Sequence, residues 1–215
     1  MSEQLAGLVT KDQSGFYWVE AQDGQEYICR LRGKLKEEAQ TSDIAAIGDR
    51  VLFTPVEEDG VSELRGIIDE VQERHSTISR AVRTTGKRGA GQAEREHVLI
   101  ANLDQALFVF AAMQPTPDWR LLDRLLVTAE RAEVKDIFIV LNKQDMLEDR
   151  TELETFLMPY RAMGYDVLYV SALQNTGVEE LTERLAGKIT VLTGPSGVGK
   201  TSLLNAIQPE LGRTV

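Results

Sequence analysis

The stretch KITVLTGPSGVGKTSLLNAI, residues 188–207, decides the fold of the second half of this 215-residue chain. It joins an apolar, strand-like run to a helical run through a loop that matches the pattern G-x-x-x-x-G-K-[ST] in full. Glycines let such a loop turn its backbone N–H groups toward phosphate oxygens at the start of a helix, where the helix dipole also favours an anion. In this pattern Lys200 reaches the β- and γ-phosphates, and the Thr201 hydroxyl binds Mg²⁺. The predicted phosphate-binding residues are Gly194, Pro195, Ser196, Gly197, Val198, Gly199, Lys200, Thr201 and Ser202.

Upstream of this stretch, apolar runs alternate with amphipathic helical runs. The apolar runs cover residues 105–112, 136–142, 166–172 and 188–194, and the helical runs cover 118–133, 149–163 and 178–186. Near-continuous apolar runs are typical of parallel strands that are buried on both faces. Repeated strand–helix units predict an open α/β sheet that binds its ligand beyond the carboxyl ends of the strands.

Two further motifs follow neighbouring strands and concern the base of the nucleotide. The sequence Asn-Lys-Gln-Asp ends at Asp145, whose carboxylate suits the two N–H donors of guanine that adenine lacks. We expect Asn142 to hold the loops together and touch the base, and the stem of Lys143 to pack on its face. After the next strand, Ser171-Ala172 offers a backbone N–H for guanine O6. The four-residue motif alone is equally compatible with a polar turn, but three motifs at three successive strand ends favour a guanine-nucleotide site.

The N-terminal part has a different, strand-like pattern from residue 5 to about residue 71. Short β-rich runs flank Asp23-Gly24 and Asp59-Gly60, and Asp-Gly between such runs indicates a hairpin turn. We therefore predict four or five short antiparallel strands in a small closed or partly open barrel. An OB-fold is the leading candidate at this size.

Charge is unevenly distributed along the chain. The formal net charge is -10, which on average opposes binding to nucleic acid. Between residues 74 and 95, however, six Lys or Arg accompany a single acid, around the glycine-rich sequence TTGKRGAGQ, which predicts a mobile basic loop. On charge alone, solvated surface and RNA contact are equally compatible with this pattern. The candidate RNA-binding residues are Arg30, Arg32, Lys34, Lys36, Arg83, Lys87 and Arg88.

Composition excludes several classes of protein. A single cysteine, Cys29, allows no internal disulfide and no zinc site that needs two thiolates from this chain, and we expect it to be a small buried strand residue. No apolar run is long enough to span a bilayer, and the first residues do not resemble a leader. We expect a cytoplasmic protein that does not bind membranes.

The order of the motifs supports a resemblance to a known family. Translation-factor-type GTPases begin with the phosphate loop, whereas here N-K-x-D and Ser-Ala precede it, which indicates a circular permutation. Permutation leaves the neighbours in a sheet unchanged when the old termini lie close together. With the N-terminal barrel, IGDRV (47–51) and VLIANLDQALFVF (98–110), the chain resembles the ribosome small-subunit-dependent GTPase family (RsgA/YjeQ type).

This resemblance implies a domain plan and a function. The plan is an OB-fold RNA-binding domain over 1–73, a basic linker loop over 74–97 and a circularly permuted, parallel-sheet GTPase domain over 98–215. The implied function is GTP binding and hydrolysis, with Mg²⁺, by a monomer in late assembly of the small ribosomal subunit (30S), whose rRNA the OB domain contacts.

The chain departs from this family after the phosphate loop. Only fourteen residues follow Thr201, so the family's switch I, its D-x-x-G loop and its zinc-binding C-terminal domain have no counterpart here. We therefore expect a truncated chain with poor hydrolysis, with zinc belonging only to the absent domain. No residue is assigned as the hydrolytic catalyst.

Two alternatives from other classes stay open at this stage. One is a P-loop ATPase or kinase in which N-K-Q-D is accidental. The other is an RNA-binding module whose nucleotide site is vestigial. Competition between GTP and ATP distinguishes the first, and the effect of Lys200→Ala on subunit binding distinguishes the second.

Overall fold

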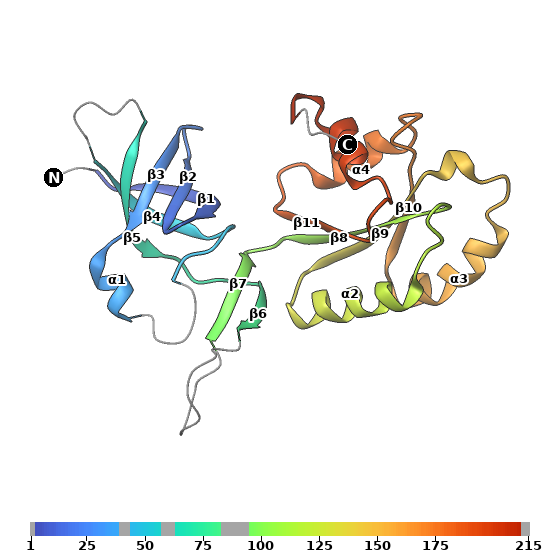
Figure 1. Ribbon diagram of the computed structural model, residues 1–215, viewed down its shortest axis with the longest axis horizontal. Helices are drawn as coiled ribbons and strands as arrows, with labels where there is room; N and C mark the ends of the chain where they lie inside the picture. Colours follow the sequence, from blue (N-terminus) through green and yellow to red (C-terminus); the bar gives the residue numbers. More distant parts are fainter. Residues whose placement is uncertain (1–2, 39–43, 57–62, 83–94, 212–215) are drawn as a thin grey trace, which may run out of the picture. The chain divides into compact units, whose positions relative to one another are not determined.

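The computed structural model describes residues 3–38, 44–56, 63–82 and 95–211 (Figure 1). The chain forms two compact units, of which the first ends at Asn102 and the second begins at Leu103. Among the described residues, no helix is both long enough and apolar enough to cross a membrane.

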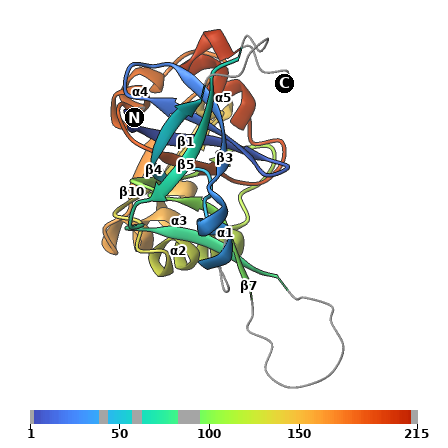
Figure 2. The same ribbon diagram turned by 90° about the vertical axis from the view of Figure 1, so that its left-hand side faces the viewer.

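The first unit is built on a closed five-stranded barrel with the strand order β1-β2-β3-β5-β4 (Figure 2). A short helix, α1 (Gly33–Glu38), follows the third strand. The barrel strands are β1 (Leu5–Gln13), β2 (Phe16–Ala21), β3 (Glu26–Leu31), β4 (Arg50–Val56) and β5 (Arg65–Val71).

One strand pair of the barrel differs from the predicted all-antiparallel arrangement. Strands β3 and β5 are parallel, while the other neighbouring pairs are antiparallel. A closed ring of five strands cannot alternate in direction all the way round, because an odd number of strands forces one neighbouring pair to run the same way. Closure of the barrel therefore requires this parallel pair.

The barrel interior is filled by alternate residues of its strands. Val19, Cys29, Phe53 and Ile68 are fully buried, and the Tyr27 ring packs on Phe53 at a tilt of 56° with 5.0 Å between ring centres. This alternation is what the period of two along a strand produces when one face meets the core. The predicted burial of Cys29 in a strand is confirmed.

The connection after the barrel differs from the predicted loop. Strands β6 (Thr77–Val82) and β7 (Arg95–Ala101) form a two-stranded antiparallel sheet. The Ala101 N–H donates to Ile47 O at 2.8 Å, and the Asn102 side chain donates to Gly48 O at 3.0 Å. These bonds attach β7 to the segment that precedes β4, and the first compact unit accordingly extends to residue 102.

The second unit contains a fully parallel four-stranded sheet with the order β10-β9-β8-β11. Each strand lies within a predicted apolar run. The strands are β8 (Gln105–Ala111), β9 (Asp136–Asn142), β10 (Asp166–Tyr169) and β11 (Thr190–Thr193).

Helices cover both faces of this sheet (Figure 1). On one face, Val178 and Leu181 of α4 and Leu203 of α5 pack with Leu107 and Val109 of β8. On the other face, α2 contacts β8 and α3 contacts β10. The helices are α2 (Trp119–Arg131), α3 (Thr151–Ala162), α4 (Val178–Leu185) and α5 (Lys200–Ile207), with 3-10 turns at Gln144–Met146 and Pro209–Leu211.

Burial of β11 differs from that of β8. All seven residues of β8 are buried, as expected for a strand covered on both faces, but the four residues of β11 are only half-buried. In the described part of the chain β11 pairs with β8 alone and is an edge strand. An edge position exposes one side of a strand, which explains the partial burial.

Candidate nucleotide site

The predicted nucleotide motifs meet at one edge of the parallel sheet. Residues 194–199 follow β11, residues 142–145 begin at the end of β9, and residues 170–177 follow β10. Because the strands are parallel, their carboxyl ends lie along the same edge, which is where such sheets bind ligands.

The phosphate loop has the backbone that its glycines allow. Gly197 and Gly199 have φ of 79° and 88°, in the left-handed region that residues with a Cβ rarely adopt. A Cβ on Gly199 would also lie 2.5 Å from Asn142 Nδ2. The Lys200 ammonium donates to the carbonyls of Gly194 at 2.9 Å and Pro195 at 2.6 Å. The loop therefore wraps around a positive charge at the start of α5, an arrangement suited to an anion.

One buried amide connects three loops of this site. Asn142, only 2% exposed, donates from Nδ2 to Val198 O at 3.0 Å and to Gly199 O at 3.4 Å. Its Oδ1 accepts from the Ala172 N–H at 3.1 Å. The end of β9 is thereby tied to the phosphate loop and to the Ser-Ala loop. Because an amide both donates and accepts, asparagine can make both connections.

Lys143 connects a fourth loop to the site, and the sequence did not indicate this connection. Its ammonium donates to Gly197 O at 2.7 Å and to Gln114 O at 2.5 Å. Gln114 lies in the connection from β8 to α2, at the carboxyl end of a third strand. The only sign of this contact in the sequence is that Gln114 follows a buried strand. Lys143 contacts the backbone carbonyl of Gln114, and every type of residue has such a carbonyl.

The Asp145 carboxylate is positioned by a buried hydroxyl. Ser171, which is fully buried, donates from Oγ to Asp145 Oδ1 and accepts from the Gln174 N–H at 3.0 Å. The Gln144 N–H donates to Val170 O at 3.1 Å and ties the two loops together. Oδ2 of Asp145 makes no hydrogen bond with the part of the chain that the structure describes. This second role for Ser171 was not predicted from the sequence, which assigned the Ser-Ala pair a backbone contact.

Thr201 lies in the first turn of α5 and is half-buried. Its hydroxyl makes no hydrogen bond within the described residues. A neutral oxygen next to a phosphate-binding loop is the type of ligand that Mg²⁺ accepts, so this residue fits the predicted metal ligand. The neighbouring Val198 side chain is buried in the core together with Leu203, which anchors the loop to the helix.

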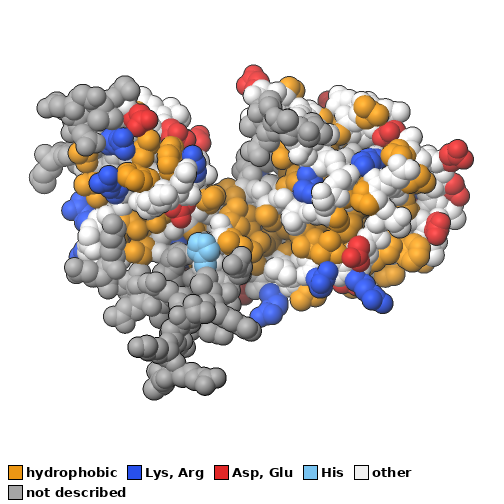
Figure 3. Space-filling view, viewed as in Figure 1, with side chains coloured by type: hydrophobic (Ala, Val, Ile, Leu, Met, Phe, Trp, Pro, Cys, Tyr) orange, Lys and Arg blue, Asp and Glu red, His pale blue; other side chains and the backbone are white. Residues whose placement is uncertain are grey.

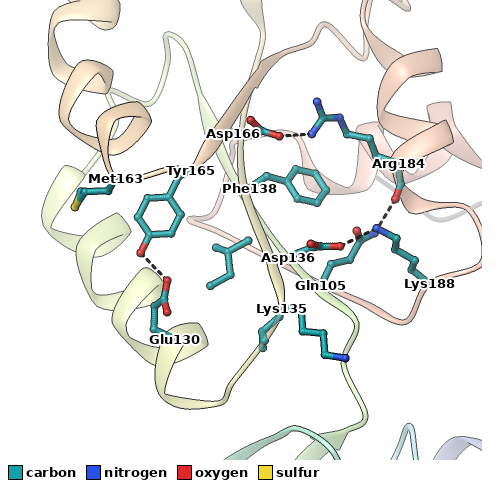
Figure 4. A pocket seen from close by; sticks show the side chains of 13 residues that line it. Gln105, Glu130, Lys135, Asp136, Phe138, Met163, Tyr165, Asp166, Arg184 and Lys188 are labelled. Atoms are coloured by element: carbon teal, nitrogen blue, oxygen red, sulfur yellow. Dashed lines mark hydrogen bonds and ion pairs between the residues drawn. The ribbon is translucent and has the colours of Figure 1, made fainter.

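A second hollow lies at the opposite edge of the sheet, where β9 and β10 begin (Figure 4). Its volume is about 370 Å³, and Phe138 lies in its wall. Arg184 pairs with Asp166 at 2.7 Å, and Lys188 pairs with Asp136 at 2.8 Å. These charges neutralise each other, and the hollow faces away from the nucleotide motifs.

The predicted RNA-binding residues belong to the first unit. Arg30 lies in β3, over the ring of Phe16, and Arg32 pairs with Asp69, which offsets its charge. Lys34 is exposed in α1. The side chain of Lys36 and all of Arg83, Lys87 and Arg88 lie outside what the structure describes.

Comparison with known families decides the relationship. The family model described as RsgA GTPase matches residues 71–215, and the model described as RsgA N-terminal domain matches residues 6–62. The chain belongs to the RsgA family. The predicted family is therefore confirmed, as is a fold made of an OB-like barrel followed by a circularly permuted GTPase domain.

Individual relatives support this assignment. The chain is 38% identical over 207 residues to the small ribosomal subunit biogenesis GTPase RsgA of Geobacillus sp. (strain WCH70), covering 95% of this chain and 61% of that protein. It is 36% identical over 208 residues to the protein of the same name from Chlorobaculum tepidum, covering 96% and 65% respectively. The RsgA-family chain thus spans less than two thirds of the length of these relatives.

Solved structures agree with the fold. The crystal structure of YjeQ from Thermotoga maritima matches with a TM-score of 0.74 and 31% identity, over 96% of this chain and 66% of that one. The structure titled YloQ, a circularly permuted GTPase, matches with a TM-score of 0.70 and 31% identity, over 97% and 66%. The permuted order of motifs in this RsgA-family chain therefore has a structural counterpart.

Proposed function

We propose that this RsgA-family protein, in its complete form, binds and hydrolyses GTP and acts in late assembly of the small ribosomal subunit. The observation that carries the proposal is the Asn142 amide, which joins the N-K-x-D, Ser-Ala and phosphate loops within one site. The ribosomal role is proposed because its relatives are named small ribosomal subunit biogenesis GTPases. We further propose that it acts as a monomer in the cytoplasm and contacts rRNA through its barrel.

Guanine selectivity is assigned to the Asp145 carboxylate. Ser171 holds Oδ1, and Oδ2 has no hydrogen bond to described residues, so the carboxylate can accept from guanine N1–H and N2–H₂. The Ala172 N–H donates to Asn142 Oδ1 and the Ser171 N–H donates to Thr176 O, so a contact of this pair with guanine O6 would require one of these N–H groups to exchange its partner. Adenine has no donors at the corresponding positions and would leave the carboxylate unpaired, which a polar site penalises strongly.

The phosphates are assigned to the loop between β11 and α5. Lys200, now bonded to two loop carbonyls, would exchange them for phosphate oxygens, which carry more negative charge. The Thr201 hydroxyl would hold Mg²⁺, which supplies charge neutralisation between the β- and γ-phosphates. No residue of the chain is assigned to activate the attacking water.

Competition against labelled GDP tests the base assignment. We expect GTP to compete and ATP not to compete. Asp145→Asn should weaken GDP binding by about two orders of magnitude and improve binding of XDP, whose extra carbonyl suits an amide donor. Asp149→Asn is the matched control, because this exposed aspartate accepts hydrogen bonds from the adjacent Arg150 and Thr151 and lies outside the predicted motif. Equal competition by ATP, or no relative gain for XDP, would contradict guanine recognition and favour an ATPase.

Binding to purified small ribosomal subunits tests the ribosomal role. The complete protein should bind them more tightly with a GTP analogue than with GDP, and Lys200→Ala should abolish this difference. If Lys200→Ala leaves subunit binding unchanged with every nucleotide, the nucleotide site is vestigial and the protein is an RNA-binding module.

A further inference from the structure

The outer face of the barrel carries two aromatic side chains, each covered by a cation. Lys11 Nζ lies 4.2 Å from the centre of the Trp18 ring, and Arg30 Cζ lies 4.6 Å from the centre of the Phe16 ring. Tyr17, between the two aromatic residues, is buried in the barrel core. The alternation of a strand therefore directs Phe16 and Trp18 to the same outward face.

The strand register places these side chains in two adjacent rows. Lys11 is opposite Trp18, which is opposite Ile28, and Gln13 is opposite Phe16, over which Arg30 lies. We call these two rows the aromatic rows. All six side chains are exposed or half-buried. On the face drawn in Figure 3, Lys and Arg side chains of this unit lie among hydrophobic ones.

The charge around the aromatic rows is not uniform. The next cross-strand pair on this outward face is Glu20 opposite Glu26, and both are exposed. These two carboxylates repel phosphate and mark one end of the surface. An anionic ligand is therefore favoured over Phe16 and Trp18 and disfavoured over the acidic pair.

A half-buried aromatic ring on the barrel surface beside an exposed cation suits one class of partner. Unpaired nucleobases stack on aromatic side chains, and the phosphates that join them require nearby cations. Bases in a duplex are already stacked and do not offer their faces. We propose that the aromatic rows stack two unpaired bases of RNA, one on Phe16 and one on Trp18, while Arg30 and Lys11 bind adjacent phosphates. This inference rests on the proposed RNA contact of the barrel.

The cations do not block such stacking. Stacking of a base on an aromatic ring is stronger than an exposed cation–π contact, so a base displaces the cation from the ring face. Lys11 and Arg30 are exposed and have long stems, so each head group can move to a phosphate. Phe16 and Trp18 stay fixed by the strand, which lowers the entropy lost on binding.

Fluorescence of Trp18 tests the stacking directly. The chain has two tryptophans, so Trp119→Phe leaves Trp18 as the only tryptophan, which is excited at a wavelength that the tyrosines do not absorb. We expect a short single-stranded oligoadenylate to quench this emission in a saturable manner. An oligomer of the same length made of abasic ribose phosphates should bind weakly and leave the emission nearly unchanged. Equal binding and quenching by both oligomers would overturn the proposal, because phosphates alone would then account for the contact.

Substitution separates stacking from charge. Phe16→Leu and Trp18→Leu, each read by anisotropy of an end-labelled oligoadenylate, should weaken binding by about tenfold without changing its salt dependence. Phe156→Leu, at an exposed ring of α3, is the matched control. Arg30→Ala keeps both rings and should reduce the salt slope by about one unit.

The outcomes distinguish this inference from the proposed function. If the 215-residue chain binds small subunits and oligoadenylate but both leucine variants bind as tightly as the parent, the stacking assignment is wrong and the RNA contact stands. If the parent binds neither, both the stacking assignment and the proposed RNA contact of the barrel fail.

Discussion

The Asn142 side chain donates to Val198 O and accepts from the Ala172 N–H, and both bonds depend on its being an amide. Asn142→Asp keeps the shape but places a carboxylate oxygen against a buried carbonyl, and neither atom can donate. An unsatisfied buried charge of this kind costs about 3 kcal/mol. We expect the free energy of unfolding in urea to fall by about that amount.

Asn175→Asp is the control for this substitution. Asn175 is exposed in the loop after β10 with a φ of 55°, a left-handed conformation that both asparagine and aspartate adopt, so its effect should stay within about 0.5 kcal/mol. Equal stability of the two variants would show that the Asn142 amide does not hold the loops together.

The Cys29 thiol gives a prediction about alkaline pH. Burial raises its pKa from 9.0 to about 12. Below pH 9 the thiol is protonated in both states, so its stabilising contribution is fully present. Between pH 9 and about 12 the unfolded chain loses this proton while the folded chain keeps it, so stability falls as pH rises.

Comparison with Cys29→Ala isolates this effect from other titrating groups. In that pH window the unfolding free energy of the parent should fall more steeply than that of the variant, by up to about 1.4 kcal/mol per pH unit. The measurement is urea unfolding at a series of pH values. Parallel pH profiles would mean that the thiol ionises equally in both states.

At the level of elements, two features of the phosphate loop oppose a side chain at Gly199: its positive φ and the lack of space for a Cβ. Gly199→Ala is destabilised by backbone strain, because φ is 88°, and by a steric clash, because the Cβ would lie 2.5 Å from Asn142 Nδ2. Gly187→Ala is destabilised by backbone strain alone, because φ is 70° and no atom would lie within 4 Å of the added Cβ. Both should lose about 1 kcal/mol of stability from the backbone.

Only Gly199→Ala should lose more stability than this and also weaken GDP binding, because the added methyl group displaces the Asn142 side-chain amide, which connects the loops of the site. Thermal unfolding and GDP titration measure the two effects. Identical losses in both variants would show that the loop relaxes around the added methyl group.

The parallel sheet leads to a prediction about hydrogen exchange. Strand β8 lies between β9 and β11 and is buried throughout, whereas β11 is half-buried and pairs with β8 alone among the described strands. Amides of an edge strand open with less loss of packing. We expect amides of Val191 and Leu192 to exchange faster than those of Leu107 and Phe108 by at least about tenfold. Equal protection would indicate that the open side of β11 is covered.

At the level of the whole molecule, an acidic chain is expected to bind RNA through local basic clusters. The predicted loop residues Arg83, Lys87 and Arg88 lie outside the described residues, so their role stays a prediction. Replacing all three with Ala should weaken binding to small ribosomal subunits. It should also reduce the salt slope by up to about three units and leave GDP affinity unchanged.

A matched triple variant controls for net charge. Arg120, Arg124 and Lys135 are exposed cations of the second unit, and their replacement with Ala removes the same charge elsewhere. This variant should leave the salt slope unchanged. Equal slopes for the parent and both triple variants would show that the basic loop is solvated surface only.

The sequence predicted most of the second unit because its signals are local. Each apolar run produced a strand, and three of the four strand–helix turns carried a motif whose residue types limit its chemistry. The prediction was less accurate near β6, where residues 77–82 were assigned to a loop. The pairing of β6 with β7 joins residues 13 to 24 positions apart, from Val82 opposite Arg95 to Thr77 opposite Ala101, and the intervening basic, glycine-rich sequence has no strand pattern of its own.

By itself, the sequence determined the family, the permuted order of motifs and the division into a barrel and a parallel sheet, because hydrophobic period and glycine placement act over a few residues. Tertiary structure alone decided that Asn142 bonds to Val198 O, 56 residues away, that Lys143 meets the Gln114 carbonyl, and that β3 runs parallel to β5. These contacts arise when strands close and loops pack against one another. Backbone carbonyls carry no residue identity, so the sequence predicted that Asn142 holds loops together but not which carbonyls Asn142 and Lys143 contact.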